Sequence, residues 1–561
     1  MKKAAARNFL PPQTSKGLEM NKYRGAALAV LAIAALSAAG FGYRNSTLRV
    51  KEESAARTQS TLPADVQARL EKLDLETREK LLGDEYFTFA IKQVPEPIRP
   101  RYLDHWLKGL EDNFCREILY EAASRAYDVE GVGTLDLPNA QAGCPKGVSV
   151  EKTREYVNGR LRAVFDDPFT FVMEPSAGRQ LITRLSGKEK LDGGVGLVFT
   201  NILDSEQTLI PGAGAKTSAK FTGLVYHAVK SGPSRAAGIQ DGDKVIKVDG
   251  TDVIGLDSDY VIESLLRGPK GSSVTLTVDR GGSVFETKIV RAEIHPDSVW
   301  LRDLGDGVFA IIVTQWDDGS AGNIYAAVLQ AKAAGATGIV VDVRNNVGGN
   351  FLQAVAAAGI FVKDGVLVST RERELVDGHP ESKHFHLDRY EMRNGRLWMV
   401  SKEEDTGKVV EQEVSIQMVE KDSSTGQARV VDNSSLYIPD LPPVVVIGNG
   451  WSASASEVFI GSVSKNRVGK GGERQGAGFV GTETAGKGIE QENTPLALGM
   501  RFSVTFGRYF LNDGSWPGDA HRIRNPIAPD LAVALPERAI IYTPDDSQLN
   551  AAVHSLRSTG K

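Results

Sequence analysis

The sequence predicts an α/β protein of several domains, in which a β-rich domain separates a helical N-terminal region from an α/β core. The chain has 561 residues, more than a single hydrophobic core usually organises. After residue 299, short continuous apolar runs alternate with helical spacing, as in a sheet covered by helices on both faces. Between residues 193 and 292, glycine and Asp-Gly turns separate short strands instead.

The first segment is predicted to direct export. Residues 1–50 contain eight Lys or Arg and one acidic residue, whereas the whole chain has a net charge of −5. Lys22 and Arg24 precede an uncharged apolar run, 25–43, that includes several small residues near its end. This is the pattern of a secretory signal, although such a run could also stay as a membrane anchor. We therefore expect residues 1–44 to be an export signal or a membrane anchor, and the mildly acidic remainder argues against general nucleic-acid binding.

The region 45–190 is predicted to be helical. Apolar residues recur at steps of three and four from residue 64 to about 127, and another helix is expected over 150–165. The chain has two cysteines, Cys115 and Cys144, and both lie in this region. Two thiols in an exported chain suggest one disulfide, and two unpaired buried thiols are the alternative.

The region 191–292 contains short strands with a helix expected at about 258–267. Its most specific stretch is Ala237-Gly238-Ile239, then Asp241-Gly242-Asp243, then Asp249-Gly250. This pattern resembles a PDZ domain, which binds a peptide as an added strand and captures its terminal carboxylate with backbone N–H groups of a glycine-rich loop. The candidate loop consists of Gly193, Gly194, Val195, Gly196 and Leu197. A purely structural β-domain with ordinary glycine turns is the alternative.

The α/β core is expected in two parts, 293–370 and 441–561. Strands are predicted at 308–313, 338–344, 444–447 and 501–510, and helices at 321–334, 351–361 and 452–464. The segment 371–440 between the two parts is polar and shows little apolar periodicity, so we interpret it as β-hairpins or a mobile insertion.

A serine cluster and one lysine are the candidate chemical groups of the core. The strand at 444–447 leads through a tight turn into small residues that enter a helix, where free N–H groups can bind an anion. Ser452, Ser454 and Ser456 all lie at this entry, and the residues alone do not choose among them. Farther on, Lys487 stands between two glycines, and a lysine brought to a serine can act as its base.

In combination these motifs resemble the carboxy-terminal processing peptidases, also called tail-specific proteases. These are exported serine proteases with a Ser-Lys dyad and a PDZ domain, and the likeness extends over about residues 150–533. The motifs that carry it are Asp167-Pro168-Phe169-Thr170, the PDZ stretch, Arg267-Gly268-Pro269-Lys270-Gly271, Asp342-Val343-Arg344-Asn345-Asn346 with Gly348-Gly349, Ser452-Ala453-Ser454-Ala455-Ser456-Glu457, and Gly486-Lys487-Gly488 with Gln491. The resemblance implies a layered α/β protease core of the crotonase/ClpP type with an inserted PDZ domain and an N-terminal helical region, without a cofactor or a metal.

The resemblance also implies roles for individual residues. Ser454 would be the nucleophile, Lys487 the general base and Gln491 the residue that orients the lysine amine. Backbone N–H groups of Gly348, Gly349 and Ala455 would bind the oxyanion. For Lys487 to be neutral at working pH, burial must lower its pKa by about three units.

The function implied is that of an exported serine endopeptidase that recognises the C-terminal regions of proteins through its PDZ domain and cleaves them through an acyl-enzyme. Its partners would be proteins or peptides with free C-termini, with no nucleic acid. An adaptor or self-association could involve the N-terminal helices, and an uncleaved N-terminal segment could contact the membrane. The location would be the bacterial periplasm or cell envelope, where the enzyme would process or degrade envelope proteins.

This sequence departs from the family pattern in places. The separation of Ser454 and Lys487 is longer than usual, and the extra residues fit a glycine-rich loop at 469–478. Val347 stands where the family generally has Pro or Gly, and Ala485 where it generally has Phe. None of these changes removes a reacting group.

Three alternatives compete with this interpretation. The chain could be a catalytically inactive PDZ adaptor. Residues 481–487 have the spacing of a Walker A motif, but Gly488 replaces the Ser or Thr that would bind magnesium. His379, His384 and His386 could belong to a hydrolase or a metal site, although we interpret them as part of a solvated loop.

Overall fold

The structure of the protein is a computed structural model. It describes residues 62–72, 103, 114–127, 137–145, 150–165, 167–185, 191–203, 208–209, 219–258, 260–373, 383–414, 418–421, 428–431, 435–468, 472, 475–495, 500–518, 523–536 and 539–559. The predicted export segment, 1–44, lies outside these residues. Among the helices within them, none has the length and apolar content that a membrane crossing requires.

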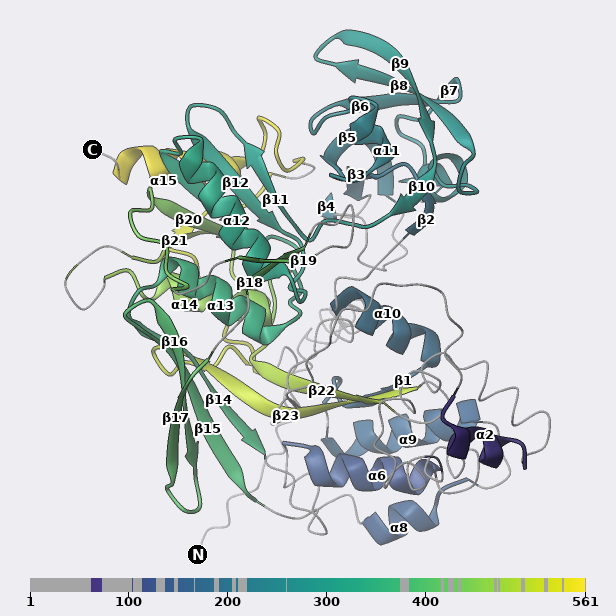
Figure 1. Ribbon diagram of the computed structural model, residues 1–561, viewed down its shortest axis with the longest axis vertical. Helices are drawn as coiled ribbons and strands as arrows, with labels where there is room; N and C mark the ends of the chain where they lie inside the picture. The colour runs from purple at the N-terminus through teal and green to yellow at the C-terminus, as the bar shows by residue number, and fades with distance from the viewer. Residues whose placement is uncertain are drawn as a thin grey trace, which may run out of the picture.

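A six-stranded sheet forms the centre of the α/β core (Figure 1). Its strands, in spatial order, are β11 (Val299–Asp303), β12 (Val308–Val313), β13 (Gly338–Asp342), β20 (Val444–Gly448), β21 (Gly478–Gly481) and β24 (Leu531–Ala532). All are parallel except β11, which pairs antiparallel with β12. The strands β12, β13 and β20 are buried at every position, because helices cover both faces of the sheet.

Successive residues of these strands point to opposite faces and enter two separate apolar clusters. The helices α12 (Ser320–Ala333), α13 (Phe351–Phe361) and α14 (Ala455–Ser464) cover one face, where they meet Ile311 and Val341. The C-terminal helix α15 (Ser547–Thr559) covers the other face. There Leu549 and Leu556 pack with the strand residues that directly precede or follow Ile311 and Val341 in the sequence.

A second, antiparallel sheet packs on the far side of α13 and α14. Its strands are β1 (Phe171–Met173), β22 (Ile489–Pro495), β23 (Arg501–Leu511), β14 (Gly365–Arg373), β15 (Phe385–Arg393), β16 (Arg396–Glu403) and β17 (Val409–Glu413). Much of the polar segment 371–440 therefore forms β-hairpins. Their first strand, β14, pairs with the long strand β23 and so attaches them to the core. A further hairpin, β18 (Met418–Lys421) with β19 (Ala428–Val431), lies near α12.

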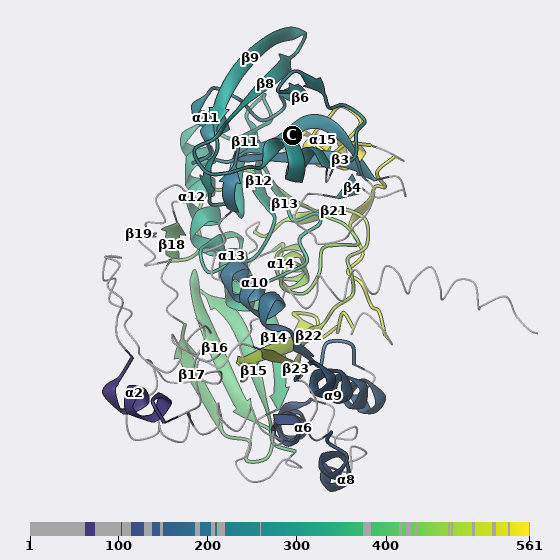
Figure 2. The ribbon, with the colours of Figure 1, turned by 90° about the vertical axis from the view of Figure 1, so that its right-hand side faces the viewer.

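The β-rich domain lies at the opposite end of the molecule from the hairpins β14–β17 (Figures 1 and 2). Its main sheet consists of β4 (Thr208–Leu209), β3 (Leu197–Leu203), β5 (Ala219–Ala228), β6 (Lys244–Val248), β8 (Ser273–Arg280) and β9 (Ser283–Val290), with β7 (Thr251–Asp252) beside β6. The helix α11 (Pro233–Ala236) is short, and the helix predicted at 258–267 is a π-helix, Tyr260–Leu266. The strand β2 (Leu191–Gly194) pairs with β10 (Ala292–Ile294) where the chain enters and leaves the domain.

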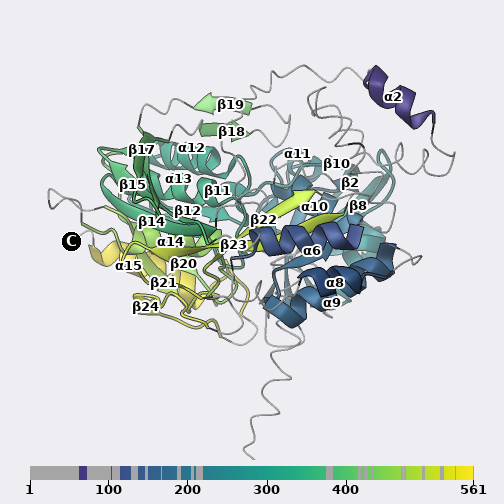
Figure 3. The same cartoon turned by 90° about the horizontal axis from the view of Figure 1, so that it is seen from below.

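The described N-terminal residues contain five helices, which are α2 (Ala64–Leu70), α6 (Phe114–Arg125), α8 (Leu137–Ala142), α9 (Val150–Phe165) and α10 (Pro175–Leu185). Figure 3 shows α6 alongside β23, and Phe502 and Val504 of that strand belong to the same apolar cluster as the helices. This packing attaches the helices to the second sheet.

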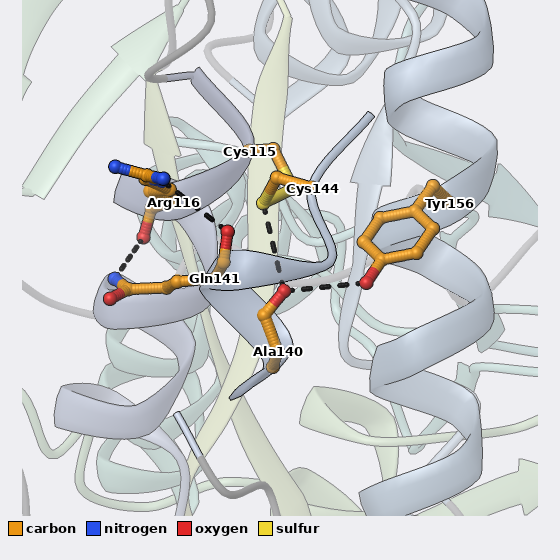
Figure 4. The surroundings of a disulfide bond; sticks show 6 residues. All are labelled: Cys115, Arg116, Ala140, Gln141, Cys144 and Tyr156. Carbon is orange, nitrogen blue, oxygen red and sulfur yellow. Dashed lines mark hydrogen bonds between the residues drawn. A yellow bond between two sulfur atoms is a disulfide. The ribbon is translucent and has the colours of Figure 1, made fainter. Parts of the chain in front are cut away.

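The expected disulfide joins Cys115 of α6 to Cys144, just after α8 (Figure 4). Both cysteines are buried in the helical cluster. Beside the disulfide, Gln141 Nε2 donates to the carbonyl oxygen of Arg116 at 2.9 Å. The covalent bond and this hydrogen bond hold α6 and α8 together.

Candidate active site

The serine cluster lies at the turn between β20 and α14. The helix begins at Ala455, three residues later than the prediction of 452, and its N-cap is Ser454 rather than Ser452. Ser454 has φ 55° and ψ −119°, a conformation that is strained for any residue except glycine. A strained residue in a sharp turn between a strand and a helix is the geometry of a nucleophile elbow. Ser454 itself is buried, with 8% of its surface exposed.

The other two serines of the motif support the turn through their hydroxyls. Ser452 Oγ donates to the carbonyl oxygen of Val343 at 2.8 Å and accepts from the backbone N–H of Asn449. Ser456 Oγ donates to the carbonyl oxygen of Asn346 at 2.8 Å and accepts from Trp316 Nε1 at 3.0 Å. Because both side chains are fully buried in such contacts, the geometry favours Ser454 as the reactive serine.

Lys487 is almost completely buried, with 1% of the residue exposed. Burial lowers the pKa of its ammonium group to about 7, against the smaller opposing effects of Asp167 and Glu457. Its Nζ donates to Gln491 Oε1 at 2.8 Å and lies 4.6 Å from the centre of the Phe169 ring. The lysine can therefore lose its proton near neutral pH.

Gln491 lies on β22 and meets Lys487 as the spacing of four residues predicts. Its Nε2 donates to the carbonyl oxygen of Phe169 at 3.0 Å and to Ser503 Oγ at 2.9 Å. These two contacts fix which end of the amide faces the lysine. Phe169 belongs to the Asp-Pro-Phe-Thr motif, so this N-terminal motif both lines the lysine site and fixes its glutamine.

Glu457 connects the serine turn to the lysine loop, a role that the sequence analysis missed. Its Oε2 accepts from the backbone N–H groups of Ser454 at 2.9 Å and of Lys487 at 2.8 Å. Its Oε1 accepts from the N–H of Gly486 at 2.7 Å and from Thr484 Oγ1 at 2.6 Å. Burial raises the pKa of this carboxyl group to about 7, although the four hydrogen bonds oppose the shift. The signal in the sequence is the capping-box spacing, with Glu three residues after the N-cap serine.

Tyr509 adds a second connection between the two segments. Its buried hydroxyl lies within hydrogen-bonding distance of the carbonyl oxygens of Ser454, at 3.2 Å, and of Lys487. Tyr509 belongs to β23, so the second sheet contacts both segments of the site through this residue. Nothing in the spacing of the motifs identifies this residue in advance.

Among the three predicted oxyanion donors, Gly348 has an N–H that already has an acceptor in the structure. Its N–H donates to Asn346 Oδ1 at 3.0 Å and is therefore already engaged. A Cβ at this position would lie 2.9 Å from Ser454 Cβ, so glycine instead allows the loop to approach the serine closely. By contrast, the N–H groups of Gly349 and Ala455 donate to no acceptor among the described residues. These two groups are available to bind an oxyanion.

The predicted carboxylate loop lies between β2 and β3. The carbonyl oxygens of Gly193, Val195 and Gly196 accept backbone hydrogen bonds from within the β-rich domain, which fixes the loop. Gly193 and Gly196 have positive φ, and a Cβ on Gly196 would lie 2.7 Å from Gly232. Among the described residues, β4 pairs with β3 only near its end, at Asn201 and Ile202. The start of β3, at Leu197, thus keeps an edge to which a peptide strand could add.

One of the alternatives, the Walker A motif, does not fit the structure. A Walker A lysine starts a helix, whereas Lys487 is followed by the strand β22, which begins at Ile489. The interpretation of the histidines as part of a solvated loop is wrong for His386. His386 lies on β15 with 8% of its surface exposed, whereas His384 is about half exposed and pairs with Asp405. His379 lies outside the described residues.

Known protein families match two parts of the chain. The model of peptidase family S41 matches residues 308–533, and the PDZ domain model matches residues 199–290. A probable CtpA-like serine protease of Staphylococcus haemolyticus is 28% identical over 326 residues, which is 58% of this chain and 52% of the relative. One of Staphylococcus epidermidis is 27% identical over 338 residues, 60% of this chain and 56% of the relative. The chain thus matches about half the length of these relatives.

Solved structures of similar proteins were also found. The photosystem II D1 C-terminal processing protease shares 23% identity with a TM-score of 0.36, over 75% of this chain and 92% of that one. A putative S41 protease from Bacteroides fragilis shares 12% identity with a TM-score of 0.42, over 79% of this chain and 97% of that one. On the sequence matches, the chain carries a peptidase domain of family S41 at residues 308–533 and a PDZ domain at residues 199–290.

Proposed function

We propose that the chain is an exported serine endopeptidase that uses Ser454 and Lys487 to cleave proteins delivered by its PDZ domain. The observation that carries this proposal is the buried Lys487, whose pKa is lowered to about 7 and whose amine is oriented by Gln491. A buried lysine without a chemical role would cost folding free energy at neutral pH, because its charged form is desolvated.

The proposed reaction begins when neutral Lys487 takes the proton of Ser454 Oγ as the oxygen attacks the scissile carbonyl carbon. The N–H groups of Gly349 and Ala455 stabilise the oxyanion of the tetrahedral intermediate. Lys487 then gives its proton to the leaving amine, which departs and leaves an ester on Ser454. Water attacks this ester as Lys487 takes its proton, and Lys487 then returns the proton to Ser454 Oγ as the acid product leaves.

Glu457 and Tyr509 would act in this reaction as positioning residues. Both contact the backbone of Ser454 and of Lys487, and neither is assigned a proton transfer. Their effect is to hold the serine turn at a fixed position relative to the lysine, which is a large part of what such a pair requires.

The PDZ domain would bind the substrate's C-terminal residues as a strand beside Leu197. The backbone N–H groups of the loop 193–197 would capture the terminal carboxylate. Partly buried apolar side chains at Leu197, Ile262 and Leu265 are available near the domain core for the substrate's side chains. Substrates would therefore be proteins or peptides with free C-termini.

We also propose a location and an architecture that the comparisons leave open. The segment 1–44 would export the chain to a bacterial periplasm or envelope, with or without retention as an anchor in the inner membrane, and the N-terminal helices could bind an adaptor or a second copy. The substrates would be envelope proteins. The layered core would be of the crotonase/ClpP type.

Cleavage of an unfolded protein tests the proposal. We expect Ser454→Ala and Lys487→Ala to lose activity by about 10²–10⁴-fold, the range expected for loss of a nucleophile or a general base. Lys402→Ala, an exposed lysine on β16, is the control and should cleave as the wild type does. Wild-type activity in Ser454→Ala would refute the mechanism. A wild-type chain that binds peptides but cleaves none would instead support the inactive PDZ adaptor.

A further inference from the structure

Four side chains of the kinds that bind metals converge on the second sheet. They are Glu372 of β14, His386 and Asp388 of β15, and Glu490 of β22. Strand pairing places Glu372 opposite His386 on one side and opposite Gly507 of β23 on the other. Gly507 is in turn paired with Glu490. The cluster therefore spans four neighbouring strands, and none of its members is assigned a role in the proposed reaction.

The distances within the cluster suit a small cation. His386 Nε2 lies 3.2 Å from Glu372 Oε2 and 3.7 Å from Asp388 Oδ2. One ligand atom from each of these three residues lies within 4.8 Å of the others. Around a tetrahedral zinc ion with bonds of about 2.0–2.2 Å, neighbouring ligand atoms are about 3.3–3.6 Å apart. Small movements of these side chains would bring them to a common ion.

Glu490 provides an independent sign that a ligand is missing from the cluster. Only 7% of its surface is exposed, and its Oε2 has no hydrogen-bond partner within the part of the chain that the structure describes. A Cβ on Gly507 would lie 2.7 Å from this oxygen and 3.0 Å from Glu372 Cγ. The glycine thus leaves room for the two carboxyl groups to approach each other.

A buried carboxylate oxygen without a partner is costly, and three carboxyl groups in one place repel each other. A divalent cation would supply both the missing contact and the missing positive charge.

We propose that Glu372, His386, Asp388 and Glu490 bind a divalent transition-metal cation of the zinc type. The imidazole among the ligands favours zinc over magnesium or calcium, which prefer oxygen ligands alone. Thr370 Oγ1 donates to Glu372 Oε1 at 2.8 Å and fixes this carboxylate, as the second layer of a metal site commonly does. Both cysteines form the disulfide, so no thiol of the chain competes for the metal.

The position of this site gives it a structural consequence. Glu490 directly precedes Gln491, whose side chain contacts Lys487. A metal would tie β22 to β14 and β15 next to this glutamine. The consequence for catalysis rests on the proposed function, whereas metal binding itself does not.

Zinc binding to tag-free, metal-stripped protein tests the site. We expect the wild type to bind one zinc ion per chain in calorimetric titration, to retain it on dialysis and to unfold at a higher temperature with zinc than without it. Glu490→Gln and His386→Asn should bind zinc at least about tenfold more weakly and lose the thermal shift. His384→Asn is the matched control, because this histidine lies two residues from His386 but is about half exposed.

Glu490→Gln also distinguishes a loss of metal binding from a defect in folding. The amide has nearly the volume of the carboxyl group and removes one repelling charge, so this variant should unfold no earlier than the wild type when metal is absent. Absence of stoichiometric zinc binding by the wild type would overturn the proposal. Zinc binding by Glu490→Gln with wild-type affinity would overturn it as well.

Discussion

At the scale of the residue, Lys487 is an ionisable side chain in a buried position that disfavours its charged form. It is buried against the Phe169 ring, and its pKa falls to about 7. A lysine in water would be almost fully protonated at that pH and could not take a proton from serine. Desolvation by the surrounding protein lowers this pKa, whereas the charges of Asp167 and Glu457 oppose the shift.

The lowered pKa predicts how activity depends on pH. Neutral Lys487 is the active form, so kcat/KM for peptide cleavage should rise as the pH increases through about 7. Lys487→Arg should be inactive at every pH, because a guanidinium group stays protonated. A rate that falls as the pH increases from 6 to 8 would contradict the role of lysine as base.

The lowered pKa of Lys487 also predicts the direction in which the free energy of unfolding changes with pH. The folded pKa, about 7, lies below the unfolded value of 10.5, so the unfolded chain binds more protons between these two pH values. Stability from this group therefore increases as the pH rises through that window. Lys487→Met should be more stable than the wild type at pH 6, and this difference should shrink by about 4 kcal/mol by pH 10. Denaturant unfolding at the two pH values measures it, and a constant difference would contradict the lowered pKa.

Glu457 predicts a separate effect on both fold and rate. Glu457→Gln replaces one acceptor oxygen by an amide NH2 group, which donates, so two of the four donors around it lose their acceptor. We expect the free energy of unfolding to fall by about 2–5 kcal/mol, and kcat to fall because the serine turn is no longer fixed. Glu483→Gln, on a more exposed neighbouring residue, is the control for stability and rate. Unchanged unfolding in Glu457→Gln would show that the four hydrogen bonds are not needed.

At the scale of the element, the serine turn shows how a strand and a helix produce a reactive position. The strand β20 is buried throughout, and the helix α14 is buried at every residue, so the short turn between them cannot relax. This rigidity holds Ser454 at positive φ. Ser452 and Ser456 stabilise that turn by hydrogen bonds, and Gly348 allows the neighbouring loop to pack closely against it.

The disulfide is a second feature at this scale. The cysteines are 29 residues apart, and a loop of this length predicts a stabilisation of about 3–4 kcal/mol in the chain-entropy account. The double change Cys115→Ser and Cys144→Ser should destabilise the helices α6 and α8 by this amount, as measured by hydrogen exchange of their amides. Exchange in the six-stranded sheet is the internal control, because the disulfide does not contact it. Equal protection of α6 with and without the disulfide would contradict this prediction.

At the scale of the whole molecule, the PDZ domain and the protease core meet the substrate in different ways. In the proposed function the core would supply the reacting groups, whereas the PDZ domain would supply a sheet edge and a carboxylate loop. Their separate positions in Figures 1 and 2 suit a substrate that is held at its tail and cleaved elsewhere.

Substrate chemistry tests this division of roles. A peptide with an amidated C-terminus should be cleaved with a higher KM than the same peptide with a free carboxylate, because the loop 193–197 would lose its charge partner. The value of kcat should change little, since the amidated end does not reach Ser454. A control peptide too short to reach the PDZ domain should show no difference between its two forms. Equal KM values for the long pair would remove the carboxylate-capture role.

The core strands and helices could be predicted from the sequence, because their apolar spacing reflects burial on both faces. The hairpins of the segment 371–440 could be suggested but not placed, because their partner β23 is more than a hundred residues away along the chain. The burial of His386 could not be predicted either, because it depends on pairing with Glu372 of β14 and Glu403 of β16. Polar neighbours in the sequence suggest solvent, whereas strand pairing buries its side chain.

The sequence by itself determined the order of the motifs, and with it the peptidase and PDZ resemblance, the pairing of Lys487 with Gln491 and the candidate disulfide. Local spacing is sufficient for these, because each depends on residues close together or on the count of cysteines. Only the tertiary structure favours Ser454 over Ser452 and Ser456, shows that the N–H of Gly348 already has an acceptor, and reveals Glu457 and Tyr509 as connections. Those decisions depend on which hydroxyl, N–H or carboxylate is already engaged by a distant segment, and hydrogen bonds across the fold leave no periodic pattern in the chain.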